Sequence, residues 1–185
     1  MKKKIMTGIA AGLFLTVAGL LTPSTGIAQK DKAKMTAESS EAKAALIKSD
    51  EGLANLFKTA YGYVIFPNIG KGALVVGGAG GKGTVYEGGK AIGWAKMTQV
   101  TVGAQAGGQA YREVIFFETE EALKRFKEDK LEFSAQMSAV AVKAGASANA
   151  KYTDGVLVFT EEIGGLMLEA SIGGQKLTYK PFDKE

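Results

Sequence analysis

The sequence predicts an α+β fold, with an antiparallel, glycine-rich β-sheet or barrel-like core, N-terminal helices and one mid-chain helix. An alanine-rich stretch from Ala37 places apolar residues at helical spacing. Residues 70–93 contain ten glycines interleaved with short apolar runs, which is typical of strands joined by tight turns and bulges. Further apolar runs of strand length recur as far as Tyr179.

The first 28 residues have the three-part pattern of a secretory signal peptide. A basic start, Lys2 to Lys4, precedes the uncharged apolar run from Ile5 to Leu21, and small residues at Gly26 and Ala28 predict cleavage after Ala28. The alternative is an uncleaved anchor, although seventeen residues are short for a membrane-spanning helix. No cysteine follows the run, so lipid attachment through cysteine is excluded. We therefore expect an exported protein of the periplasm or extracellular space, soluble or peripherally associated with a membrane.

After the signal peptide we expect a flexible segment, residues 29–36, and then a single domain, residues 37–185. Helical spacing from Ala37 indicates the N-terminal helices, and Asp50 marks a break at which a second helix can start. The run from Tyr61 to Phe66 predicts a buried strand that ends at Pro67. Within residues 70–93 we expect short strands, hairpins and bulges.

The second half of the chain predicts one helix among strands. Thr119 is the expected N-cap of a helix from Glu120 to Asp129, with acidic residues in its first turn. The expected strands before and after that helix cover residues 99–106, 114–117, 133–141, 156–159, 166–168 and 177–179.

Composition argues against the common kinds of catalytic and metal site. The chain has no histidine and no cysteine, which removes the usual general base, the usual nucleophile pairs and the usual zinc or copper ligands. No Asp-rich calcium loop is present either. We expect no catalytic residues, no metal and no cofactor. A hydrolase that uses serine and lysine stays as the weakest alternative, because no motif brings such a pair together.

Charge favours an anionic partner other than nucleic acid. Without the leader, 20 basic and 19 acidic residues give a net charge of +1, so the basic isoelectric point belongs mostly to the export signal. Residues 29–112 carry a net +5 and residues 113–185 a net −4. Such asymmetry can orient a protein against an anionic surface, although two ordinary solvated faces give the same count.

Two glycine motifs resemble nucleotide-binding loops but lack their context. Gly78, Gly80 and Gly83 have dinucleotide-fingerprint spacing, yet a strand and then a turn at Gly88-Gly89 follow them where a helix is required. Gly83 also separates Lys82 from Thr84, which breaks the phosphate-loop pattern. The lysines beside these glycine-rich turns are better candidates for binding phosphate head groups. Trp94 fits either packing or contact with a lipid interface.

An ordered series of motifs resembles the SYLF domain. It comprises residues 61–67, the glycine-rich residues 77–83, Gly93-Trp94, residues 103–108, the strand at 114–117 with the helix after it, and residues 164–170. The resemblance covers about residues 53–180. It implies a non-catalytic domain that binds anionic lipid; eukaryotic members prefer phosphoinositides, some yeast members bind actin and assembly factors, and bacterial members are usually exported. Neither phosphoinositides nor actin is expected as the ligand of an exported bacterial-type protein.

Anionic phospholipid head groups, or an anionic membrane surface, are therefore the expected partner, and nucleic acid is not. The alternative is a structural or interaction protein of the cell envelope that docks a protein partner. For the lipid hypothesis the expected binding residues are Lys43, Lys48, Lys58, Lys71 and Lys82, with Trp94 as an apolar contact.

Overall fold

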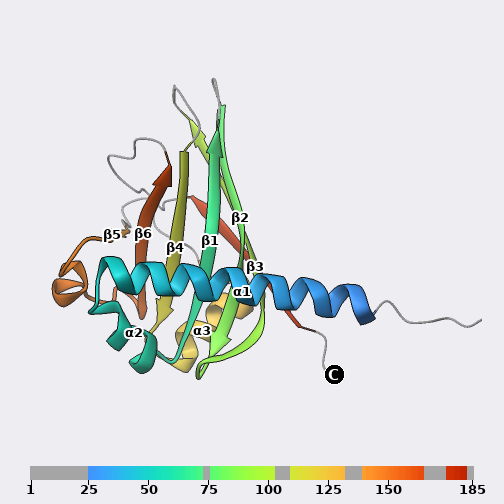
Figure 1. The fold of residues 1–185 in the computed structure, drawn as a ribbon, viewed down its shortest axis with the longest axis horizontal. Helices are drawn as coiled ribbons and strands as arrows, with labels where there is room; N and C mark the ends of the chain where they lie inside the picture. The colour runs from blue at the N-terminus through green and yellow to red at the C-terminus, as the bar shows by residue number, and fades with distance from the viewer. Residues whose placement is uncertain (1–24, 73–75, 103–108, 132–138, 165–173, 183–185) are drawn as a thin grey trace, which may run out of the picture.

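The computed structural model describes residues 25–72, 76–102, 109–131, 139–164 and 174–182. These form a seven-stranded sheet in the order β5-β6-β4-β1-β2-β3-β7, with α1 and α2 on one face and α3 on the other (Figure 1). All strand pairs are antiparallel except β5 with β6. The expected α+β class, with helices before the sheet and one in mid-chain, is confirmed.

The elements follow the chain in a simple order. The helices are α1 (Thr25–Ser49), α2 (Leu53–Thr59) and α3 (Glu120–Lys127), with a short 3-10 helix η1 (Ala146–Asn149). The strands are β1 (Gly62–Gly72), β2 (Val76–Glu87), β3 (Lys90–Val102), β4 (Gln109–Phe117), β5 (Val140–Ala141), β6 (Val156–Gly164) and β7 (Gln175–Pro181). Of the expected strands, residues 103–106, most of 133–141 and all of 166–168 lie outside the described residues.

The sheet is open, but it curls around its α3 face. Three strands separate β4 from β7 in the sheet, yet the Gln175 side-chain amide on β7 donates a 3.0 Å hydrogen bond to the Glu113 carboxylate on β4. The described edge strands β5 and β7 do not pair with each other, so the core is a curled sheet rather than a closed barrel. This curl determines which strand faces remain exposed.

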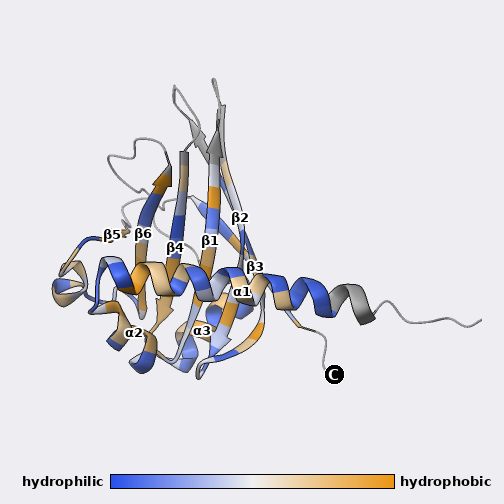
Figure 2. Ribbon diagram, in the orientation of Figure 1, coloured by the Kyte–Doolittle hydropathy of each residue, from blue (hydrophilic) through white to orange (hydrophobic). Residues whose placement is uncertain are grey.

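Helix α1 begins earlier than the sequence analysis predicted. Residues 29–36, expected as a flexible segment, are helical here, which suits their alanine, lysine and glutamine content. The N-terminal part of α1 extends past the sheet (Figure 1). Figure 2 shows α1 as mostly polar with short apolar patches, whereas α2 is largely apolar. The assignment of residues 1–28 to a leader and of residues 37–185 to one domain stays a prediction.

The break at Asp50 is confirmed and has a clear cause. The Asp50 carboxylate accepts hydrogen bonds from the Gly52 amide at 3.1 Å and from the Ser147 amide of η1 at 2.6 Å. Burial raises the pKa of Asp50, but these bonds outweigh burial and hold the pKa below its usual value. The carboxylate thereby fixes the α1–α2 turn against η1.

Strand β1 continues through Pro67, where the sequence analysis ended it. Pairing with β2 and β4 shifts register around Pro67, between Ile65 and Ile69. A bulge accommodates proline because the bulged residue needs no ladder hydrogen bond. The short strands expected within residues 70–93 are likewise wrong: most of this stretch belongs to the long strands β2 and β3. Their tight turn is where expected, with Gly88 and Gly89 at φ of 54° and 78°.

Two apolar clusters hold the layers together. Leu46 of α1 and Phe57 of α2 pack on Tyr63, Phe116 and other residues of one sheet face. On the opposite face, three residues of α3 pack among side chains from six strands; they are Ala122, Leu123 and Phe126.

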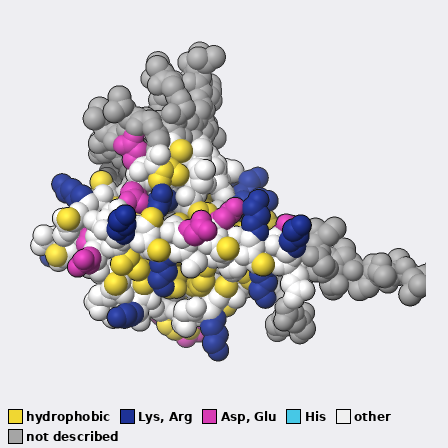
Figure 3. All heavy atoms as spheres, in the orientation of Figure 1, with side chains coloured by type: hydrophobic (Ala, Val, Ile, Leu, Met, Phe, Trp, Pro, Cys, Tyr) yellow, Lys and Arg dark blue, Asp and Glu magenta, His cyan; other side chains and the backbone are white. Residues whose placement is uncertain are grey.

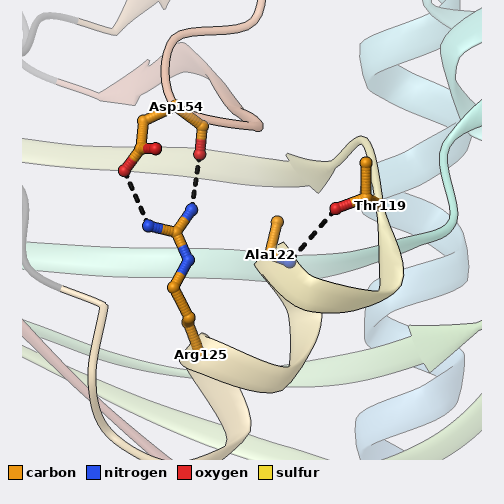
Figure 4. Close-up of polar contacts among 4 residues, drawn as sticks. All are labelled: Thr119, Ala122, Arg125 and Asp154. Carbon is orange, nitrogen blue, oxygen red and sulfur yellow. Dashed lines mark hydrogen bonds and ion pairs between the residues drawn. The ribbon is translucent and has the colours of Figure 1, made fainter.

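Helix α3 is fixed at its start and along its exposed side. The Thr119 hydroxyl accepts a hydrogen bond from the Ala122 amide at 3.3 Å, so the expected N-cap is confirmed (Figure 4). Arg125 reaches the turn before β6, where its guanidinium donates to the Asp154 carboxylate at 2.7 Å and to the Asp154 carbonyl at 2.6 Å. These contacts hold α3 against the concave side of the sheet.

Candidate functional site

The outer face of β2, β3 and β7 carries exposed lysines around one tryptophan. Trp94, Lys96 and Thr98 alternate along β3 with the buried Ala95 and Met97. Antiparallel pairing places Thr84 and Lys180 beside Trp94, Lys82 and Thr178 beside Lys96, and Lys176 beside Thr98. Neighbouring strands lie about 4.8 Å apart, so these side chains form one continuous surface. We call it the basic face; its members are Lys82, Trp94, Lys96, Lys176 and Lys180.

Trp94 lies between two of the lysines. The Lys82 ammonium is 5.4 Å from the centroid of the Trp94 ring and the Lys180 ammonium is 5.7 Å from it. Cations at this distance are attracted by the ring quadrupole, by about 0.5–1 kcal/mol at exposed sites. The half-buried ring therefore presents an apolar patch flanked by positive charge, which is the pattern that suits a membrane interface.

Among the described residues, no carboxylate forms an ion pair with the four lysines of the basic face. In the described part of the chain, none of them lies within ion-pairing distance of an acidic side chain. Glu87, the sole acid in the described residues of β2, β3 and β7, instead binds the Tyr61 hydroxyl at 3.0 Å and Lys127 at 3.1 Å. The basic face therefore keeps an unopposed positive charge.

A groove between α1 and β2 adjoins the basic face. It encloses a cavity of about 260 Å³, and Lys82 belongs to both the groove and the basic face. Figure 3 views the molecule with α1 toward the reader and shows basic and acidic side chains interleaved along this helix. The groove therefore offers both signs of charge, whereas the basic face offers only one.

The expected binding residues lie in four different places. Lys82 and Trp94 come together on the basic face. Lys48 and Lys58 are exposed in the last turns of α1 and α2, at the other end of the sheet face. Lys71 lies near the end of β1, where its backbone pairs with Ala79 and Gln109.

Lys43 is held inside a small aromatic cluster. Its ammonium lies 4.5 Å from the Phe57 ring centroid and 5.1 Å from that of Tyr63, and it donates a 3.2 Å hydrogen bond to the Tyr63 hydroxyl. Burial lowers the pKa of Lys43. These contacts assign Lys43 to packing between α1 and the sheet.

The list of expected binding residues left out three lysines of the basic face: Lys96, which lies beside the glycine-rich turns, Lys176 and Lys180. The period-two alternation of Trp94, Lys96 and Thr98 was a usable signal for a half-exposed strand. The pairing of β7 with β3 left no such local signal, because Lys180 lies 86 residues after Trp94 in the chain.

The described residues contain no group of three acidic side chains placed to hold a metal ion. Glu113 is fully buried on the concave side of the sheet, and burial raises its pKa to about 7 despite the hydrogen bond from Gln175. A carboxylate with no exposed surface cannot contact an external ligand. Within the described residues, no helix has the length and apolar character needed to cross a membrane.

Comparison with known proteins agrees with the motif series. A family model described as "Las17-binding protein actin regulator", Ysc84, matches residues 98–180. This part of the chain is therefore similar to the Ysc84, or SYLF, family. The resemblance inferred from the motifs is therefore confirmed over these residues. They contain Lys176 and Lys180 of the basic face, whereas the other three members precede the match.

The chain is also similar to Beta cell expansion factor A of Aeromonas veronii. The two are 32% identical over 123 residues, which is 65% of this chain and 46% of that protein. The chain thus spans less than half the length of this relative. Similarity to the SYLF family over residues 98–180 is consistent with a binding role, toward lipid or in connection with actin regulation.

Proposed function

We propose that this protein is an exported, non-catalytic domain that binds anionic lipid at a membrane surface through its basic face. The observation that carries the proposal is a set of four lysines that share one exposed sheet face with Trp94 and form no ion pair with a described residue. Similarity to the SYLF family supports a binding role, and the N-terminal signal pattern supports export.

The expected attachment is weak and reversible. A lysine near an anionic membrane contributes about 1 kcal/mol, so four contribute about 4 kcal/mol, which corresponds to a dissociation constant of about 1 mM. Contact of Trp94 with the interface adds to this value. Such binding depends on lipid density, and it suits a protein that samples a membrane surface.

Vesicle cosedimentation with charge-reversed variants tests the proposal. The variant Lys96→Glu/Lys180→Glu should lose most binding to vesicles of anionic phosphatidylglycerol and neutral phosphatidylcholine, because two attractions become repulsions. The matched control Lys48→Glu/Lys58→Glu changes charge equally at the other end of the sheet face and should keep most binding. The N-terminus of each protein is determined by mass spectrometry, so that a retained leader is recognised.

The same pair of variants separates the two sets of lysines. Loss of binding in the control alone would move the site to the C-terminal ends of α1 and α2. Absence of wild-type binding to anionic vesicles would contradict the proposed function. The description of the family as Las17-binding favours a protein partner as the second candidate, and that partner would be sought by crosslinking from the basic face.

A further inference from the structure

The groove beside the basic face has an unusual combination of charges. Helix α1 contributes Asp31, Lys34, Met35 and Glu38, whose spacing places them on one face of the helix. Strand β2 contributes Lys82 from the opposite wall. The remaining lining residues are Ser39, Pro67, Gly83 and Thr84. Two carboxylates and two ammonium groups thus surround one cavity.

The two hydroxyl groups at the floor of the groove already have hydrogen-bond partners within the protein. The buried Ser39 hydroxyl donates to the Thr84 hydroxyl at 2.8 Å, and the Thr84 hydroxyl donates to the Met35 carbonyl at 3.1 Å. Both hydroxyl protons are therefore used in these hydrogen bonds, which also hold α1 against β2. Recognition of a ligand therefore falls to the charged groups at the rim.

The rim groups are solvated and only loosely paired with each other. Lys34 and Glu38 approach to 3.9 Å, with 75% and 48% of their side chains exposed, so their mutual attraction is weak. Lys82 contacts the Trp94 ring and forms no ion pair with a described residue. A ligand can therefore engage the rim without first breaking a strong bond.

We propose that this groove binds a phosphoethanolamine head group. This inference rests on the proposed function, since Lys82 links the groove to the basic face. The phosphate lies toward Lys82 and Lys34, and the primary ammonium lies toward Asp31 and Glu38. A purely anionic head group is disfavoured by the two carboxylates. A phosphocholine group is disfavoured because its quaternary nitrogen has no N–H to donate to them.

Vesicles of equal charge isolate the effect of the head group. Phosphatidylglycerol is kept at a fixed fraction, and the neutral remainder is either phosphatidylethanolamine or phosphatidylcholine. The wild-type protein should bind the phosphatidylethanolamine mixture more tightly by on the order of fivefold, which is the effect of one good, partly exposed ion pair. The readout is the ratio of the two affinities, because this ratio cancels any general change in electrostatic attraction.

Variants assign the preference to the groove. Asp31→Asn/Glu38→Gln should bring the ratio close to one while binding to anionic vesicles persists. The control Glu41→Gln removes an exposed charge of α1 that does not line the groove, and it should keep the wild-type ratio. A preference that survives in the double variant would reflect bilayer packing and would overturn the inference.

The outcomes also separate this inference from the proposed function. A wild-type ratio near one, with anionic binding intact, overturns the groove assignment alone. Loss of all anionic binding overturns the proposed function. NMR titration with free phosphoethanolamine identifies the source of the head group: shifts confined to the groove support the soluble compound, whereas a vesicle preference without such shifts supports the lipid.

Discussion

Burial decides which charged residues of this protein can meet a ligand. Lys43 and Lys82 both lie in the basic half of the chain and both contact aromatic rings. Lys43 contacts two rings of the packed layer between the helices and the sheet, and burial lowers its pKa. Lys82 is exposed and contacts a single half-buried ring. The sequence could not distinguish the two, because the difference depends on what lies across from each side chain.

Glu113 gives the clearest prediction at the residue scale. Burial raises its folded-state pKa to about 7 from an ordinary value of 4.5. The folded state therefore holds this proton more tightly than the unfolded state. The corresponding stability is present below about pH 4.5 and is lost as the pH rises through 7. Between pH 4.5 and 8 the loss is on the order of 3 kcal/mol.

The variant Glu113→Gln should remove this pH dependence. Its free energy of unfolding in urea should exceed that of the wild type at pH 8, and the difference should shrink toward pH 5. The exposed Glu118→Gln serves as the control and should follow the wild type at both values. A wild-type protein at least as stable at pH 8 as the variant would show that the native state accommodates the charge.

At the element scale, local patterns predicted helices and turns better than strand lengths. The Thr119 cap, the Asp50 break and the turn at Gly88 and Gly89 all follow from local chemistry, and the sequence identified each of them. Strands β1 and β2 run through residues that ordinarily end strands, namely Pro67 and several glycines. Neighbouring strands on both sides supply the pairing that overrides those local preferences.

Asp50 connects three elements, so its removal should be costly. In Asp50→Ala, the Gly52 and Ser147 amides lose their acceptor, and hydrogen bonds to a charged group contribute about 1.5–3 kcal/mol. The urea midpoint should fall by an amount equivalent to about 2–3 kcal/mol. The neighbouring exposed Glu51→Ala should change stability by less than about 0.5 kcal/mol. Equal midpoints for the two variants would mean that water replaces the carboxylate without loss.

At the scale of the whole molecule, the basic face exists because of sheet order. Lys82, Lys96 and the C-terminal lysines of β7 become neighbours when β7 pairs with β3 at the sheet edge. From the sequence, Trp94 and Lys82 were expected in one candidate site. Lys176 and Lys180 belong to residues 113–185, whose net charge is −4, and so were not expected in that site. A net charge summed over a segment hides a face that is assembled from both segments. The family resemblance led us to expect a binding domain, and the topology shows where four lysines without an ion pair to a described residue come together.

The two forces at the basic face should respond differently to salt. Charges separated by more than about 8 Å are screened at physiological ionic strength, and at 1 M the screening length falls to about 3 Å. Attraction by the four lysines should therefore disappear at 1 M sodium chloride, whereas interfacial contact by Trp94 should persist.

At 0.05 M salt, Trp94→Ala should weaken vesicle binding severalfold while leaving the steepness of its salt dependence nearly unchanged. Lys96→Glu/Lys180→Glu should flatten that dependence. Cosedimentation across a salt series measures both, and wild-type binding that is undiminished at 1 M would show that lysine attraction does not hold this face to the membrane.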